Sequence, residues 1–134
     1  MSSASVPPPA RLSTVVLDAR DAHELAHFYA RLLGYEVRAE EPHWVLIGPS
    51  DGAAGTALAF ETEPAYAPPV WPTRNAGDQQ MMLHLDVEVD DLEAETARAV
   101  AEGATLAGDQ PQADVRVLFD PSGHPFCLWV RASQ

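Results

Sequence analysis

The stretch that decides the fold is residues 81–103, MMLHLDVEVDDLEAETARAVAEG. Apolar and polar side chains alternate as far as Val89, which predicts a strand, because successive side chains of a strand point to opposite faces. Asp90 and Asp91 stand where a helix cap is expected, and Gly103 is a typical helix terminator. The apolar residues between them recur at helical spacing: Leu92, Ala97, Val100 and Ala101. The stretch therefore predicts a strand followed directly by an amphipathic helix.

The first half of the chain repeats this pattern about 70 residues earlier, which indicates an internal duplication. A strand is predicted over residues 12–19, and Asp21 is the expected cap of a helix that runs to Leu33. Gly34 follows as the expected left-handed terminator. The buried face of this helix is predicted from its apolar residues: Leu25, Ala26, Phe28, Tyr29, Leu32 and Leu33.

Three short strands are predicted after each helix, so both halves have the order βαβββ. They span residues 35–39, 44–47 and 56–61 in the first half, and 105–107, 115–119 and 126–131 in the second. The sequence predicts an α+β fold of two tandem βαβββ modules. The expected organisation is a flexible Pro-rich arm (1–11) and a single domain (12–134) made of module one (12–62), a Pro-rich linker (63–80) and module two (81–132).

Composition excludes several classes of partner. The 134 residues hold 20 acidic and 8 basic side chains, all of the latter arginine and scattered singly, and the formal net charge is -12. Nucleic acid is therefore not expected as a partner. No apolar run is long enough to cross a membrane. The single cysteine, Cys127, has no partner for an internal disulfide, and the N-terminus lacks a signal-peptide pattern, so we expect a cytoplasmic protein.

Several strings resemble the vicinal oxygen chelate superfamily, the glyoxalase-like and bleomycin-resistance-like proteins. Module one carries Asp21, Phe28-Tyr29 and Leu33-Gly34, and module two opens with HLDVEVDDL at residues 84–92. The ending DPSGHPFCL, residues 120–128, is similar to the branch common in actinobacterial genomes. The resemblance implies a cupped mixed β-sheet with the helices outside, and a homodimer. It does not settle function, because related folds carry unrelated activities.

The resemblance also implies four metal-ligand positions, one on the first and one on the last strand of each module. They fall on Thr14, Glu61, His84 and Cys127. Thr14 is a poor ligand for a divalent ion, and Cys127 stands where metal-using members carry a carboxylate. We therefore expect an incomplete metal site and no cofactor. The alternative is a divalent metal, such as zinc, held by Glu61, His84 and Cys127.

Strand alternation places His84 and Asp86 on one face of module two, together with Cys127 and Trp129, while Phe126 and Leu128 face the helix. Asp86 is expected to orient His84 or to act as a general base. The candidate catalytic residues are His84, Glu61 and Asp86. The candidate ligand-binding residues are Thr14, Trp44, Glu61, Trp71, His84, Asp86, Cys127 and Trp129.

Tryptophans and acids around a concavity suit a neutral or cationic planar molecule. The first functional hypothesis is accordingly a protein that binds a small organic molecule without a complete metal site. The alternatives are a metal-dependent lyase or isomerase of the glyoxalase type that uses Glu61 and His84, and a catalytically silent interaction module.

Overall fold

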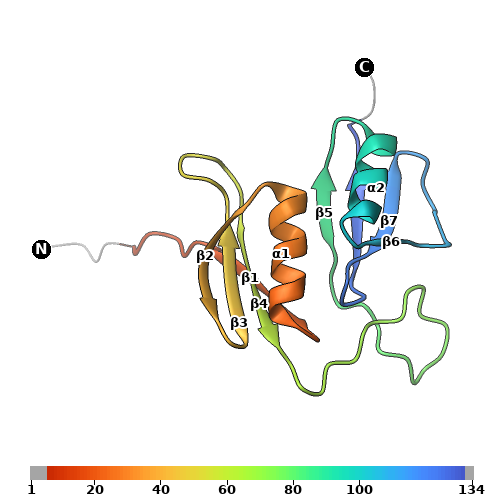
Figure 1. Ribbon diagram of the computed structural model, residues 1–134, viewed down its shortest axis with the longest axis horizontal. Helices are drawn as coiled ribbons and strands as arrows, with labels where there is room; N and C mark the ends of the chain where they lie inside the picture. Colours follow the sequence, from red (N-terminus) through yellow and green to blue (C-terminus); the bar gives the residue numbers. More distant parts are fainter. Residues whose placement is uncertain (1–5, 132–134) are drawn as a thin grey trace, which may run out of the picture.

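A computed structural model describes residues 6–131 and confirms the order βαβββ in both halves (Figure 1). The first half consists of β1 (Thr14–Ala19), α1 (Ala22–Leu33), β2 (Glu36–Glu41), β3 (Trp44–Gly48) and β4 (Ala57–Thr62). The second half consists of β5 (Leu85–Glu88), α2 (Leu92–Ala101), β6 (Thr105–Leu106), β7 (Val115–Phe119) and β8 (Pro125–Trp129). Residues 6–13 carry no helix or strand; the rest of the predicted arm and the end of module two lie outside the described residues.

Each half forms its own four-stranded mixed sheet, and the two sheets do not close into a barrel. The strand orders are β1-β4-β3-β2 and β5-β8-β7-β6. The first strand of each half lies parallel to the last strand of the same half, and the remaining pairs are antiparallel. This equivalence of the two sheets confirms the predicted duplication.

The helix boundaries follow the predicted capping signals. The Asp21 carboxylate accepts hydrogen bonds from the backbone N–H groups of His23 and Glu24, and Gly34 has φ 68°. In the second half, Asp91 caps α2 by accepting from the N–H of Ala94. At 12 and 10 residues, α1 and α2 are both too short to cross a bilayer, and the described part of the chain holds no other helix.

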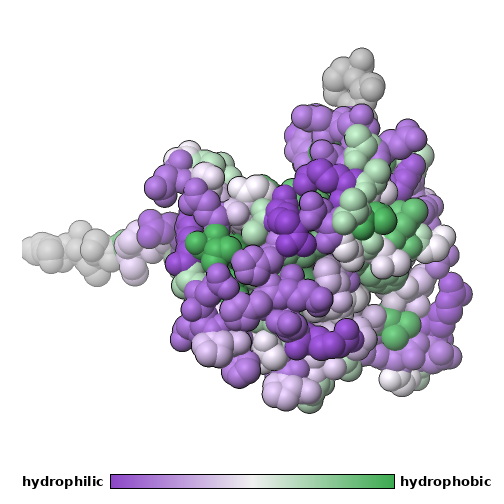
Figure 2. All heavy atoms as spheres, in the orientation of Figure 1, coloured by the Kyte–Doolittle hydropathy of each residue, from purple (hydrophilic) through white to green (hydrophobic). Residues whose placement is uncertain are grey.

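The core lies between α1 and the two sheets. Tyr29 of α1 stacks on Phe60 of β4, with ring centroids 5.7 Å apart, and meets Phe126 of β8 edge-on at 5.8 Å. Phe28 also contacts Phe126, with its ring centroid 5.8 Å away. Because these aromatic rings come from both halves, the halves share one core. The opposite side of α1 faces solvent, and Figure 2 shows mostly hydrophilic residues over it.

A buried carboxylate also joins the two halves. Asp120, in the turn between β7 and β8, is 4% exposed and accepts a 2.7 Å hydrogen bond from the Tyr29 hydroxyl. It also accepts from the backbone N–H groups of Ser122 and His124, and the Nδ1 atom of His124 lies 2.9 Å from its Oδ2 atom. Burial raises the pKa of the Tyr29 hydroxyl well above its usual range, so this hydroxyl stays a donor.

One predicted strand is shorter than expected. Residues 81–84 were predicted to belong to the strand that opens module two, but β5 begins at Leu85. Leu85 pairs with Phe126, so the next residue of β8 in the same direction is Pro125, which has no N–H to donate. In a strand over residues 81–84, alternation would turn Leu83 away from His84 and toward the helix, but Leu83 is 57% exposed. The sheet partner, rather than the alternation of residues 81–84, determines where this strand begins.

The contact between Tyr29 and Asp120 generates a stability prediction. Replacing Tyr29 by Phe keeps the packed ring and removes one hydrogen bond to a buried carboxylate, so we expect a loss of about 1.5–3 kcal/mol in the free energy of unfolding, measured by urea denaturation. The control is Tyr35→Phe, whose hydroxyl donates to the Thr56 carbonyl at an exposed position and whose loss should cost less. Equal stability of the Tyr29 variant and the parent would contradict this role.

Candidate functional site

The face of the second sheet that points away from the core carries a cluster of reactive side chains. Phe126 and Leu128 are fully buried in the core, so alternation along β8 turns Cys127 and Trp129 to the opposite face. β5 lies parallel to β8, and Asp86 is directly opposite Cys127 in the register. The sheet therefore fixes the carboxylate and the thiol as neighbours.

His84 completes this cluster from the residue just before β5. Its Nδ1 atom lies 2.8 Å from Oδ1 of Asp86. His84, Asp86 and Cys127 each offer one potential ligand atom, and these three atoms lie within 4.8 Å of one another. At this distance the Asp86 carboxylate attracts the imidazole of His84, so an orienting role of Asp86 stays a prediction.

The environment of Cys127 keeps its sulfur protonated. Burial, followed by the charge of Asp86 and a hydrogen bond to Asp86, raises the pKa of the thiol to about 11. A thiol with this pKa is neutral at pH 7, so it donates to Asp86 and is a weak nucleophile. Coordination of a metal by Cys127 would first require removal of this proton.

A cavity of about 380 Å³ opens beside the cluster. Trp129 of β8 and Trp71 of the segment between the halves both line it. We call it the tryptophan cavity; its lining residues are Trp71, His84, Asp86, Pro111, Gln112, Asp114, Val115, Val117, Cys127 and Trp129. The lining contains two aspartates and neither lysine nor arginine, so its fixed charge is negative.

The other predicted site residues lie on the first sheet. Thr14 is on β1, while Glu61 of β4 pairs in register with Asp18 on one side and Trp44 on the other. Neither Thr14 nor Trp44 lines the tryptophan cavity. Among residues 6–131, Glu61 does not join the donor atoms of His84 and Cys127. The structure thus brings Asp86, and not Glu61, to these two residues.

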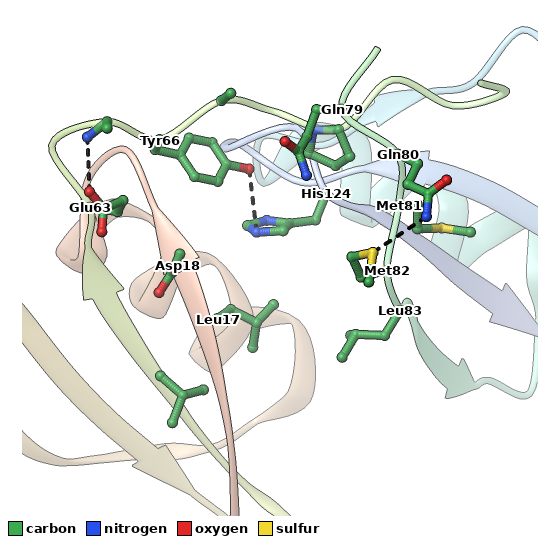
Figure 3. A pocket seen from close by; sticks show the side chains of 14 residues that line it. Leu17, Asp18, Glu63, Tyr66, Gln79, Gln80, Met81, Met82, Leu83 and His124 are labelled. Carbon is green, nitrogen blue, oxygen red and sulfur yellow. Dashed lines mark hydrogen bonds between the residues drawn. The ribbon is translucent and has the colours of Figure 1, made fainter. Parts of the chain in front are cut away.

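A second cavity, of about 360 Å³, lies where the two halves meet (Figure 3). We call it the junction cavity; Val16 and Asp18 of β1 line it on one side, and Met82 and Leu83 on the other. Tyr66 closes one end: its hydroxyl donates to the Ser122 carbonyl at 2.8 Å. Sequence reasoning missed Met82 and Leu83 as lining residues because it placed both in a strand. The proline at position 125, which ends the pairing, was the available signal.

Figure 3 also shows how His124 is placed in the junction cavity, with Tyr66 on the same side. The Nε2 atom of His124 lies 3.3 Å from the Tyr66 hydroxyl, and its Nδ1 atom faces Asp120. Burial, followed by the charge of Asp120, raises the pKa of Tyr66 to about 12. Both ring nitrogens of His124 are thus occupied by the contacts that hold the rim of the cavity.

Comparisons with known proteins agree with this architecture. The family model of the glyoxalase-like domain matches residues 14–129. No curated protein sequence matches the chain. A glyoxalase/bleomycin resistance protein/dioxygenase family enzyme from Burkholderia phytofirmans PsJN is similar in structure, with a TM-score of 0.66, 20% identity, and coverage of 90% of this chain and 98% of that chain.

Two further solved structures share the fold. TnmS3, an antibiotic binding protein from Streptomyces sp. CB03234, has a TM-score of 0.62 and 20% identity, over 95% of this chain and 100% of that chain. The bleomycin-binding protein from Streptomyces verticillus, solved with copper(II)-bleomycin, has a TM-score of 0.56 and 15% identity, over 94% of this chain and 100% of that chain. At these identities the likeness concerns the fold alone.

The pairing of Asp86 with Cys127 predicts a change in thiol reactivity. Replacing Asp86 by Asn removes the negative charge that disfavours the thiolate, so the pKa of Cys127 should fall and its alkylation by iodoacetamide at pH 8 should accelerate about 3- to 10-fold. Asp114→Asn is the matched control, because Asp114 lines the same cavity without contributing to the raised pKa of Cys127. An unchanged rate in the Asp86 variant would show that Asp86 does not act on the thiol.

Proposed function

The chain belongs to the glyoxalase-like domain family, and from this fold and its own side chains we propose that it binds a small planar organic molecule, neutral or cationic, in the tryptophan cavity. The observation that carries the proposal is the combination of Trp71 and Trp129 with two carboxylates around one cavity. Indole rings bind flat molecules by stacking and attract cations to their faces, and carboxylates favour positive charge nearby.

The size and charge of the cavity support this ligand class. A volume of about 380 Å³ falls in the range of small-molecule sites, roughly 300–1,000 Å³. Trp129 already has a cation near its ring: the guanidinium carbon of Arg131 is 5.8 Å from the ring centroid. Because Arg131 is paired with Glu88 at 3.2 Å, its charge is largely compensated. An anionic ligand, in contrast, would meet Asp86 and Asp114 in a chain of net charge -12.

Two of the structurally similar proteins bind antibiotics, TnmS3 and the bleomycin-binding protein. They support a binding role, since proteins of the same fold bind a small molecule in both cases. Identity at or below 20% does not carry the ligand across. The ligand class proposed for this chain therefore rests on its own tryptophans and carboxylates. No cofactor is part of this proposal. We also propose a cytoplasmic location, because the one cysteine, Cys127, has no partner for an internal disulfide of the kind that is common in secreted proteins.

A second candidate is a metal-dependent lyase or isomerase of the glyoxalase type. The close donor atoms of His84, Asp86 and Cys127 favour it, and these three side chains would hold the ion. A divalent ion there would supply Lewis-acid polarisation of a substrate oxygen. The absence of Glu61 from the donor set weighs against it. His84 and Asp86 would in either case orient a polar group of the ligand.

We also propose that two copies of the chain pair. Three apolar side chains at the junction cavity are unusually exposed: Val16 at 54%, Met82 at 78% and Leu83 at 57%. Contact with a second copy would remove this apolar surface from water. Sedimentation equilibrium of the full chain should then give the mass of a dimer, and Leu83→Glu should shift it toward the monomer. A monomeric parent at high protein concentration would contradict the pairing.

Ligand binding is testable with three probes of nearly equal size: N-methylquinolinium (cationic), quinoline (neutral) and quinaldate (anionic). We expect the affinity to fall in that order, and tryptophan fluorescence to report binding, because Trp71 and Trp129 line the cavity. Replacing Trp71 by Ala should weaken binding of the cation by about 1–2 kcal/mol. Trp44→Phe is the matched control, since Trp44 lies on β3 of the other sheet.

The same titration separates the two candidate functions. Binding without a metal predicts equal affinity for N-methylquinolinium with and without EDTA, whereas a metal-dependent site predicts that EDTA abolishes it. Failure of all three probes, or tighter binding of the anion than of the cation, would contradict the proposed ligand class.

A further inference from the structure

We propose that His23, His27 and Glu40 form a surface site for a divalent transition-metal cation such as Zn²⁺. This site lies on the first half of the chain, where the beginning of α1 meets the end of β2 (Figure 1). It shares no residue with the tryptophan cavity. The inference is therefore independent of the proposed function.

The helix and the strand bring the three side chains together. His23 and His27 are four residues apart on α1, so they project from the same side of the helix. Glu40 is on β2, the edge strand of the first sheet, and its Oε2 atom lies 2.9 Å from Nδ1 of His23 and 3.4 Å from Nε2 of His27. One donor atom from each residue lies within 4.8 Å of the other two. A single ion could contact all three with small side-chain adjustments.

The backbone orients one of the imidazoles for this role. The Nε2 atom of His23 lies 2.7 Å from the carbonyl oxygen of Glu41, to which it donates. Because a carboxylate oxygen accepts, Nδ1 donates to Glu40 in the ion-free chain; an ion would displace that proton and bind Nδ1, while the Nε2–H group keeps its bond to the Glu41 carbonyl. Metal-binding histidines commonly have such a hydrogen bond from the second ring nitrogen, which fixes both the tautomer and the ring orientation. One of the three donors, His23, thus has the supporting contact that a chance surface cluster lacks.

The type of donor selects the class of cation. Two imidazole nitrogens and one carboxylate oxygen suit Zn²⁺, Co²⁺, Ni²⁺ and Cu²⁺, whereas Mg²⁺ and Ca²⁺ prefer oxygen donors alone. The side chains of His23, His27 and Glu40 are 36%, 44% and 41% exposed, so an ion reaches them without rearrangement of the core. Three protein donors leave one position of a four-coordinate ion for water.

Binding at this site would connect α1 to an edge strand. Within the described sheet, β2 has hydrogen bonds to one strand, β3. Its other contacts with an element of the first half are those with α1. An ion that binds the folded chain alone raises its stability in proportion to the logarithm of the free ion concentration. The expected consequence is a thermal midpoint that rises with added Zn²⁺ and does not rise with Mg²⁺.

The test is an isothermal titration of Zn²⁺ into the full chain, free of any histidine tag and carrying Cys127→Ser, which removes the sulfur donor from the tryptophan cavity. We expect one Zn²⁺ per chain. In this background, His27→Ala or Glu40→Gln should weaken binding by roughly 10-fold or more. His43→Ala is the matched control, because His43 is exposed and lies outside the cluster. Its affinity should equal that of the parent.

Absorption of bound Co²⁺ provides a second readout, because ligation by nitrogen and oxygen alone gives no sulfur-to-cobalt charge-transfer band even in the chain that retains Cys127. Circular dichroism of the ion-free variants checks that they are folded. If His27→Ala fails to fold, Glu40→Gln still tests the site, because it is a substitution at an exposed position. Equal Zn²⁺ affinity in the parent, His27→Ala and Glu40→Gln variants would overturn the proposal. N-methylquinolinium binding should be unchanged in these variants, so this result and failure of the proposed function are distinguishable.

Discussion

The buried carboxylate of Asp120 determines how the two halves of the chain meet. It accepts from the Tyr29 hydroxyl of α1 at 2.7 Å, from two backbone N–H groups of its own turn, and from the ring of His124. A buried carboxylate without these donors would be strongly destabilising, so the contacts are mutually dependent. Through His124 and Tyr66 the same network extends to the segment between the halves. The start of β8, and with it the direction in which Cys127 and Trp129 point, follows from this turn.

Much of this architecture could be predicted from local patterns. Alternation along β8 correctly turned Cys127 and Trp129 away from the core, and the capping residues Asp21 and Gly34 marked the ends of α1. Two features could not be predicted in this way. The first residue of β5 depends on a proline in its partner strand, and whether Glu61 reaches His84 and Cys127 depends on how two separate sheets lie relative to each other. Periodicity within one strand carries no information on either.

The two faces of the second sheet serve different purposes. One face contributes Phe126 and Leu128 to the common core, while the other exposes a histidine, a carboxylate and a thiol beside two tryptophans. Asp86 contacts both reactive groups there: its carboxylate lies 2.8 Å from Nδ1 of His84, and together with burial it keeps Cys127 protonated. A neutral thiol and a negatively charged rim favour recognition of a flat cation over nucleophilic chemistry. The first sheet, which carries Thr14, Trp44 and Glu61, supports the core and the junction cavity.

The most direct test of ligand binding in the tryptophan cavity is a crystal structure of the full chain with bound N-methylquinolinium. We expect the quinolinium ring to lie against the indoles of Trp71 and Trp129, with its positive nitrogen toward Asp86 or Asp114 and without a metal ion between ligand and protein. A ligand located in the junction cavity, beside Val16 and Tyr66, would contradict the assignment of the site. A ligand held through a metal on His84 and Asp86 would contradict binding without a cofactor and support the enzymatic alternative.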